Sequence, residues 1–341
     1  MFSPSVTRLT PDPTLAIQPA LHPERMSPWL AQAIGLRPDE RDALSCDAEV
    51  LSHKLGQRCT IRYTLRGHAE SSRTKLPVTL IGKLYAKRPM AGRLYRRLEA
   101  LGRGPFESGA SLRVPRPLLV VRDLGLVVLD HFPGADLREV LHDGGAYEAL
   151  TLAGRWLARL HAAVPLAGLR SASPDHELGK VQRWCDLIGS ALTGADAGRL
   201  DLALKSMGDL TGRLKFEPVM IHTDFYFGNV LWDGERVCVL DFDELAVGDP
   251  ALDLGHFLAH LEVFAYRIEG RVNGLSAAAM TFSKAYATTD QTLALRVTFY
   301  RAYTFLKLAA TEAARKPDGW DRMAQKLAGL ACRELEQAVC E

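Results

Sequence analysis

The chain has 341 residues, which is enough for two domains with substantial cores, and its 24% charged and 47% hydrophobic residues are ordinary for a globular protein. A formal net charge of +2, with no long block of lysine and arginine, gives no electrostatic reason to expect a nucleic-acid partner. No apolar stretch approaches the ~20 residues that a membrane helix needs, so we expect no membrane partner either.

The cysteines and the first residues of the chain indicate a compartment. Six cysteines are scattered without the close spacing of a zinc site or the density of a disulfide-rich domain. The opening sequence, MFSPSVTRLTPDPT, lacks the basic region and apolar core of a signal peptide. We therefore expect a soluble protein of the reducing cytoplasm.

The first 46 residues are predicted to form an arm followed by a short helix. Residues 1 to about 25 are rich in proline, serine and threonine and show no sustained periodicity, which is typical of an extended or partly ordered arm. Ser27 resembles an N-cap and Pro28 resembles a first helical residue. This pattern predicts a helix that continues through Ile34.

An antiparallel sheet is predicted next, from the runs Val50–Lys54, Cys59–Leu65 and Val78–Tyr85. The loop between the first two runs contains one glycine, and its backbone amides around Gln57 and Arg58 are able to donate hydrogen bonds to phosphate oxygens. An ordinary hairpin turn explains the same residues, so both interpretations stay open here.

Lys83 is a candidate functional residue because it interrupts the apolar strand sequence LIGKLY. An ammonium group in such a strand needs a partner or a path to water, since burying it unpaired is costly. Glu99 is the candidate partner, in a predicted helix from Gly92 to Leu101 whose leucines recur at helical spacing. The alternative is a lysine that reaches solvent along an edge strand.

Two more strands, Leu118–Val121 and Leu126–Leu129, are predicted before the segment DHFPGADLREVL. Pro133 and Gly134 predict a turn in this segment, either on the surface or in a connection between domains. Asp136 resembles the N-cap of a helix that ends at Leu141.

Beyond residue 145 the periodicity is mostly helical. Apolar residues recur at helical spacing from Leu150 to Val164, and His161 on this packed helix is expected to be structural. Two amphipathic segments follow at about 178–192 and 198–214, and the last hundred residues include the largely apolar helix LALRVTFYRAYTFLKLAA.

The stretch 219–253 carries the densest set of candidate functional residues. An apolar run leads into a loop, and two short strands joined by the Asp233-Gly234 turn bring the chain back. Oxygen-bearing side chains of this stretch converge at strand ends: Asp224, Asn229 and Asp241. Hard oxygen atoms suit Mg²⁺, and a carboxylate is able to orient a hydroxyl group and take its proton. Turn formation and loop capping are the plain alternative.

Four neighbouring residues are predicted to support this loop. His222 is expected to pack beneath it. Asp243 follows Asp241 by two residues and would point the same way if the segment is extended, so it is a candidate to assist the metal or the substrate, or it caps a turn. Asp249 resembles an N-cap followed by proline at the first helical position. Asp253 is expected to be half-buried and to accept hydrogen bonds from the loop backbone.

The spacing within this stretch resembles a known family. The pattern HxDxxxxN at His222 to Asn229, the DFD at Asp241 to Asp243 and the tail GDPALDL are similar to aminoglycoside phosphotransferases and choline kinases, a branch of the kinase-like enzymes. Thr223 departs from the glycine that is usual at this position of the family. The resemblance covers most of the chain from about residue 47.

The resemblance implies an α+β, two-lobed protein-kinase-like fold with a small antiparallel-sheet N-lobe and a mostly helical C-lobe. It divides the chain into an arm and short helix (1–46), a nucleotide-binding N-lobe (47–128), a hinge (129–135) and a C-lobe with the catalytic loop and acceptor-binding helices (136–341).

The resemblance also implies roles for the candidate residues. Asp224 is the expected base, and Asn229 and Asp241 are the expected Mg²⁺ ligands. The expected nucleotide contacts are the phosphate anchor with its partner, the loop over the phosphates and the hinge backbone at the adenine: Lys83 and Glu99; Gln57 and Arg58; Leu129, Asp130, His131 and Phe132.

The expected activity is transfer of the γ-phosphate of ATP, or alternatively of GTP, to a hydroxyl group of a small molecule. A protein kinase and a nucleotide-binding pseudokinase are the rival interpretations. Residues 245–341 contain eleven acidic residues and eleven lysines and arginines, so the sequence does not indicate the strongly acidic pocket that a cationic aminoglycoside would favour. The acceptor therefore stays open among sugars, amino alcohols, aminoglycosides and other natural products. It gives no indication of an oligomeric state.

Overall fold

The computed structural model describes residues 12–37, 44–67, 75–107, 111–142, 146–189, 195–212 and 215–340. The chain divides into two compact units, the first formed by Met1–Ser108 with Val114–Pro133 and the second by Gly109–Arg113 with Gly134–Glu341. Residues 1–11 of the predicted arm lie outside the described residues.

The first unit is built on one antiparallel sheet with the strand order β1-β2-β3-β6-β5, as the alternating runs predicted. Three helices accompany it. The bounds of these elements are α1 (Ile17–Leu21), α2 (Pro23–Ala33), β1 (Ser45–Lys54), β2 (Arg58–Arg66), β3 (Val78–Tyr85), α3 (Pro89–Arg103), β5 (Pro117–Val121) and β6 (Leu126–Asp130).

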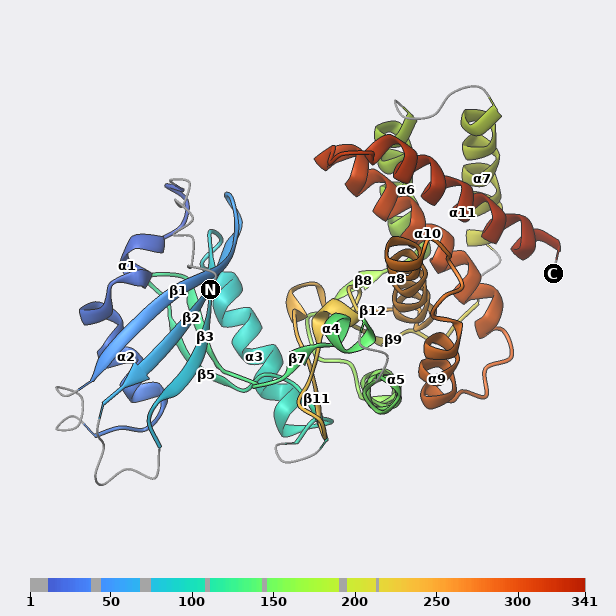
Figure 1. Ribbon diagram of the computed structural model, residues 1–341. Helices are drawn as coiled ribbons and strands as arrows, with labels where there is room; N and C mark the ends of the chain where they lie inside the picture. Colours follow the sequence, from blue (N-terminus) through green and yellow to red (C-terminus); the bar gives the residue numbers. More distant parts are fainter. Residues whose placement is uncertain are drawn as a thin grey trace. The chain divides into compact units, whose positions relative to one another are not determined.

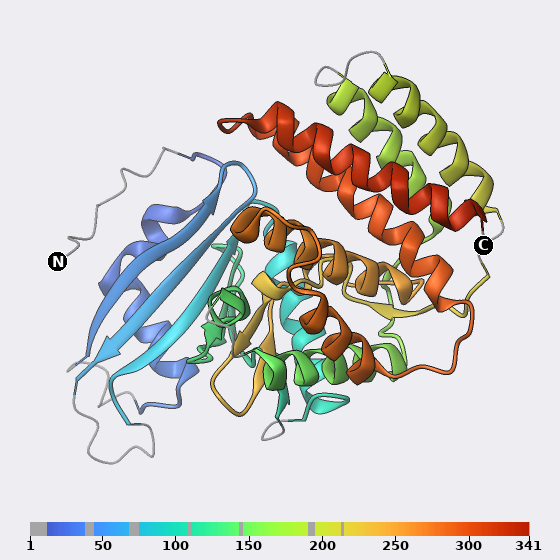
Figure 2. The same ribbon diagram turned by 45° about the vertical axis from the view of Figure 1, so that its right-hand side comes forward.

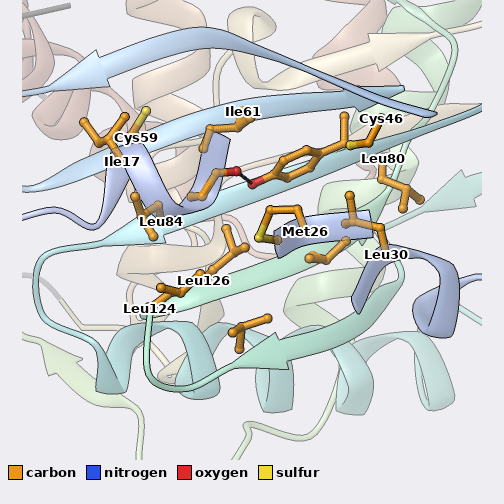
Figure 3. Close-up of a cluster of buried hydrophobic side chains, with 14 of the residues drawn as sticks. Ile17, Met26, Leu30, Cys46, Cys59, Ile61, Leu80, Leu84, Leu124 and Leu126 are labelled. Atoms are coloured by element: carbon orange, nitrogen blue, oxygen red, sulfur yellow. Dashed lines mark hydrogen bonds between the residues drawn. The ribbon is translucent and has the colours of Figure 1, made fainter. Parts of the chain in front are cut away.

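One face of this sheet packs against α1 and α2 (Figure 1). Figure 3 shows Ile17, Met26 and Leu30 of the helices lying over Ile61 and Leu126 of the strands. A buried hydrogen bond fastens α1 to the sheet, because the hydroxyl of Tyr63 donates to the carbonyl oxygen of Ala20 over 2.8 Å.

Gly82 on β3 provides the space for that tyrosine. A Cβ atom at this position would lie 2.6 Å from the Tyr63 ring, so any side chain here would displace the ring. The glycine in LIGKLY is therefore needed for packing.

The predicted start of the N-terminal helix is wrong. Helix α2 begins at Pro23, so Pro28 lies inside it, and α1 forms within the stretch that was expected to be an extended or partly ordered arm. Met26 and Leu30 are both fully buried, and burial of two such side chains contributes about 3–6 kcal/mol. This offsets the ~3 kcal/mol cost of an internal proline, so packing outweighs the local capping signal at Ser27.

The opposite face of the sheet meets α3, whose buried residues are Ala91, Leu94, Leu98 and Leu101. Side chains alternate along a strand, and Leu80 and Leu84 belong to the core under α1 and α2. Lys83 therefore lies on the α3 face of β3.

The second unit contains two small sheets and most of the helices. The strand orders are β4-β11-β10-β7 and β8-β12-β9. The strands are β4 (Leu112–Arg113), β7 (Ala135–Asp136), β8 (Arg170–Ala172), β9 (Val219–Ile221), β10 (Val230–Trp232), β11 (Val237–Val239) and β12 (Ala246–Gly248).

The helices of this unit are α4 (Leu137–His142), α5 (Tyr147–Ala162), α6 (Pro174–Gly189), α7 (Ala195–Thr211), α8 (Ala251–Glu269), α9 (Ser276–Tyr286), α10 (Leu293–Arg315) and α11 (Trp320–Cys340). Helices α10 and α11 run side by side, and α6 and α7 pack against this pair (Figure 2). Val164 lies beyond the end of α5 and is 86% exposed, so the predicted apolar stripe ends earlier. None of the described helices has the length and apolar character needed to cross a bilayer.

Candidate active site

His222 packs beneath the candidate catalytic loop, as predicted. It follows β9, is fully buried and lies against the rings of Trp156 and Phe242, with centroid distances of 6.3 and 5.1 Å. Its Nε2 lies 2.9 Å from the carbonyl oxygen of Leu240, and the backbone N–H of Asp224 points to its Nδ1 over 3.4 Å. These partners require a proton on Nε2 and a lone pair on Nδ1, so the ring is neutral and fixes the loop.

Asp253 of α8 holds the same loop from below. Its carboxylate accepts hydrogen bonds from the backbone N–H groups of His222 and Thr223, both over 2.7 Å, and lies 3.1 Å from Nε2 of His161. The predicted loop donors are therefore confirmed, and so is the structural character of His161, whose Nδ1 also contacts the hydroxyl of Tyr286.

The predicted half-burial of Asp253 is wrong, because its side chain is fully buried. The helical stripe could not reveal this, since the covering residues come from other parts of the chain. Burial acts to raise the pKa of Asp253, but the hydrogen bonds and charge of His161 and the loop outweigh burial, so the pKa stays below its ordinary value.

Thr223 adopts a left-handed backbone conformation with φ of +71°. This region is unfavourable for a β-branched residue and costs of order 1–3 kcal/mol, which explains why glycine would suit the position. Two hydrogen bonds oppose the cost: the backbone bond to Asp253, and a 3.1 Å bond from the threonine hydroxyl to the carbonyl oxygen of Glu244.

Asp224 comes next, and its two carboxylate oxygens face different groups. Oδ2 lies 3.4 Å from Nδ2 of Asn229, which also donates to the backbone oxygen of Asp224 over 2.9 Å. Oδ1 lies 3.0 Å from the ammonium nitrogen of Lys307 and 3.3 Å from Nε2 of His256. The side chain remains 38% exposed.

The charge state of Asp224 follows from these neighbours. Burial acts to raise the pKa of the carboxyl group, but the hydrogen bond from His256 and the charge of Lys307 outweigh it. The pKa therefore lies below the ordinary 3.8, and the group is ionised at neutral pH.

Asp241 lies at the same end of the β10–β11 ribbon as Asn229. Val230 pairs with Val239, and the N–H of Leu240 donates to the carbonyl oxygen of Asn229 over 2.8 Å. Asp241 has a φ of +67°, a left-handed conformation that aspartate adopts more readily than most residues. The ribbon thus places the backbones of Asn229 and Asp241 at one end, and the convergence of their side chains on a metal stays a prediction.

The donor set fits a hard cation. Nδ2 of Asn229 is held by Asp224, which leaves the amide oxygen of Asn229 as the ligand atom. No cluster of three or more histidine, cysteine, aspartate or glutamate side chains that could hold a metal occurs among the described residues. Two oxygen ligands suit Mg²⁺, which usually takes its remaining ligands from water and substrate phosphates.

The prediction for Asp243 is wrong in its premise. Phe242–Glu244 form a 3₁₀ turn, so the alternation of an extended strand does not apply and Asp243 does not follow the direction of Asp241 on that ground. Asp249 does cap α8: its carboxylate accepts from the N–H of Ala251 over 2.9 Å and also binds the buried Arg296.

In the first unit, Lys83 lies opposite Thr60 of β2 and Val127 of β6, so it is on an interior strand of the sheet and not on an edge strand. Its side chain is half-buried. The carboxylate of Glu99 forms an ion pair with Arg103 over 3.0 Å. A Lys83–Glu99 pair remains a prediction.

The loop between β1 and β2 is a tight turn whose amides already have acceptors. The N–H of Gln57 donates to the carbonyl oxygen of Lys54 over 3.0 Å, and the N–H of Gly56 donates to the carboxylate of Asp12 over 2.8 Å. Arg58 pairs with Lys54 and Tyr85 in the sheet. A phosphate contact from this loop remains a prediction, and in this arrangement the Gln57 amide is occupied.

Two of the four predicted hinge residues belong to β6, and the other two follow it. Leu129 and Asp130 still belong to the sheet, and Asp130 accepts a hydrogen bond from the N–H of Arg116 over 2.6 Å. His131 and Phe132 follow the strand, and the chain leaves the first unit after Pro133. A contact of their backbone with adenine remains a prediction.

Sequence reasoning missed Lys307 and His256, the two basic residues at Asp224. Lys307 is 83 residues away in the chain from Asp224, on α10, and its position in a largely apolar helix was the one local signal that could have marked it. His256 follows Asp253 by almost one helical turn, so the same helix that holds the loop presents both side chains to it.

Solved structures with a similar fold are kinases of small molecules. The chain is 14% identical to the aminoglycoside phosphotransferase APH(4)-Ia, with a TM-score of 0.59 over 90% of this chain and 97% of that one. It is 15% identical to a choline/ethanolamine kinase family protein from Mesorhizobium loti, with a TM-score of 0.53 over 85% of this chain and 92% of that one. It is 13% identical to an ethanolamine kinase from Plasmodium vivax, with a TM-score of 0.57 over 90% of this chain and 86% of that one.

These structural matches establish the kinase-like α+β fold. A match to a family model establishes the family. No curated protein sequence matches the chain. The model of the phosphotransferase enzyme family matches residues 79–279, which is more than half of the chain and includes Lys83, the catalytic loop and α8. The protein is therefore a member of the phosphotransferase enzyme family.

Proposed function

We propose that the protein transfers the γ-phosphate of ATP to a hydroxyl group of a small molecule, with Mg²⁺ as the metal. The arrangement of Asp224 and Asn229 carries this proposal. An ionised carboxylate, partly exposed and fixed by a buried scaffold, lies directly beside an amide whose oxygen is available as a metal ligand.

In the proposed reaction the acceptor hydroxyl donates a hydrogen bond to Asp224. The carboxylate orients the hydroxyl oxygen and takes its proton as the new oxygen–phosphorus bond forms, while the bond between the γ-phosphorus and the oxygen of the ADP leaving group breaks. Asn229 and Asp241 would hold Mg²⁺, which neutralises charge on the phosphates. His222 and Asp253 would keep the loop in place and Asp249 the start of α8, and none of the three would take part in the chemistry.

The first unit supplies the proposed nucleotide contacts. Lys83 would bind the α- and β-phosphates, and Glu99 would orient it. The backbone of His131 and Phe132, beyond the last ladder residue of β6, would contact the adenine. An APH(4)-Ia variant was solved as a ternary complex with ADP and hygromycin B, which supports a nucleotide and a small-molecule acceptor for this chain.

A screen tests this proposal directly. The purified protein with Mg-ATP is incubated with a library of hydroxylated metabolites and antibiotics, and products are identified by their added phosphate in the mass spectrum. We expect one or more phosphorylated alcohols that disappear in the Asp224→Asn variant. Phosphorylation of added proteins in place of small molecules would favour the protein-kinase alternative, and nucleotide binding without any turnover would favour a pseudokinase.

A further inference from the structure

The two oxygens of the Asp224 carboxylate separate a metal side from an acceptor side. Oδ2 faces Asn229, a proposed metal ligand, whereas Oδ1 faces Lys307 and His256. The proposed Mg²⁺ neutralises the phosphates from the Asn229 side. Lys307 therefore adds a positive charge on the side where the acceptor must approach the carboxylate.

Lys307 retains hydrogen-bonding capacity on that side. Its ammonium group has three N–H donors, and its only partner within the described part of the chain is Oδ1 of Asp224, over 3.0 Å. The side chain is 32% exposed, so the remaining donors are accessible to a bound molecule. Burial and the nearby charge of Lys307 act to lower the pKa of His256.

Helices α8 and α10 offer no comparable negative charge. Each of their carboxylates already faces a basic partner: Asp253 with His161, Glu262 with Arg301, Glu269 with Arg271 and Glu312 with Arg267. A cationic acceptor next to Asp224 would therefore be repelled by the Lys307 ammonium group, and the carboxylates of α8 and α10 already have basic partners. An anionic acceptor would find Lys307 ready to bind it.

We infer that the acceptor carries an anionic group, a carboxylate or a phosphate, close to the hydroxyl that is phosphorylated, and that Lys307 binds this group. This inference rests on the proposed function. It makes the acceptor a hydroxy acid or a phosphorylated alcohol, in contrast to a cationic amino alcohol or aminoglycoside.

Matched acceptors test the inference. Glycerol is paired with glycerate and glucose with glucuronate, so that the members of a pair share one carbon skeleton and differ by a carboxylate in place of a CH₂OH group; choline and ethanolamine form a separate cationic set. We expect the anionic member of a pair to be phosphorylated with a kcat/KM roughly 10- to 100-fold above the neutral member, the effect of one charge-assisted hydrogen bond. Transfer that is best to neutral or cationic alcohols would overturn the inference and leave the proposed kinase activity intact.

Three variants assign the effect to Lys307. Lys307→Met should bring the ratio of kcat/KM between the anionic and the neutral member of a pair close to one, whatever the rate on the neutral member, and Lys307→Arg should restore much of the native ratio because the charge is kept. Lys284→Met, an exposed lysine on α9, is the matched control and should behave as the native protein. An equal loss on all acceptors in Lys307→Met would show that the ammonium acts on the transferred phosphoryl group, which contradicts the inference.

A binding measurement covers the case in which none of these alcohols is a substrate. With Mg-ADP present, glycerate and inorganic phosphate should raise the thermal midpoint of the native protein and of Lys284→Met, but not of Lys307→Met. Equal midpoint shifts in native protein and Lys307→Met, or no shift in either, would refute an anion site at Lys307 without bearing on nucleotide use or phosphoryl transfer.

Discussion

At the scale of single residues, the candidate catalytic loop combines an unfavourable backbone conformation with several hydrogen bonds that hold it. Hydrogen bonds from Thr223 to Asp253 and Glu244 offset the energetic cost of its left-handed backbone conformation. His222 is neutral with a fixed tautomer, so it positions Asp224 and does not compete with it for a proton. The loop therefore presents one ionised carboxylate in a defined direction.

Replacing that carboxylate tests its role. We expect Asp224→Asn to lower kcat by roughly 10²- to 10⁴-fold, the usual contribution of a positioned base, with little change in the affinity for Mg-ATP measured by calorimetry. Asp233→Asn is a suitable control, because Asp233 lies in the β10–β11 turn and is paired with Arg236. Transfer at the native rate in Asp224→Asn would contradict the assignment.

At the scale of elements, α8 supports the loop through one buried carboxylate. Asp253→Asn keeps the size of the side chain but removes its charge and leaves one of its backbone donors without an acceptor. We expect the free energy of unfolding, measured with urea at pH 7, to fall by about 2–4 kcal/mol. Glu269→Gln at the end of the same helix should change it by less than ~0.5 kcal/mol. Equal unfolding free energies for Asp253→Asn and Glu269→Gln would contradict the proposal that Asp253 supports the loop.

The same helix gives a pH dependence. The pKa of Asp253 is lowered in the folded protein relative to the ordinary 3.8. Its contribution to stability is therefore fully present above the unfolded pKa and is lost as the pH falls through the folded pKa. We expect the difference in unfolding free energy between native protein and Asp253→Asn to shrink below about pH 4. A difference that grows with acid would contradict the direction of the shift.

Helix α2 provides a second prediction at this scale. Met26 is fully buried between α2 and the sheet, so Met26→Ala should destabilise the protein by about 2–5 kcal/mol. Trp29 on the same helix is 42% exposed, and Trp29→Ala should cost less than ~1 kcal/mol. Denaturant titration distinguishes the two, and a small effect at Met26 would show that α2 is not part of the core.

At the scale of the whole molecule, the proposed nucleotide contacts are assigned to the first unit, where Lys83 lies on an interior strand. We expect Lys83→Met to raise the KM for ATP by roughly 10- to 100-fold, since a charge-assisted contact with phosphate is lost, and to leave the thermal midpoint unchanged. Lys75→Met, an exposed lysine before β3, serves as the control. An unaltered KM for ATP would show that the first unit binds the nucleotide by other groups.

The sequence predicted the parts of the fold and site that depend on local pattern. The antiparallel strands, the β10–β11 ribbon and the cap at Asp249 follow from alternation, turn residues and capping, which act over a few residues. Lys307 could not be found in this way, because tertiary packing alone brings α10 to the loop. The depth of Asp253 and the start of α2 also depend on distant partners, and there the local signals at Ser27 and Asp253 gave the wrong result.

The contact between Asp12 and the turn at Gly56 has a practical consequence. The carboxylate of Asp12 accepts hydrogen bonds from the N–H of Gly56 and from His53, so a residue from the beginning of the chain fastens the tip of the β1–β2 hairpin. Proteolytic trimming just beyond Asp12 would exchange this anion for a new terminal ammonium and release the hairpin tip. Protein prepared for assays should keep this residue, and purification tags are better attached at the other end.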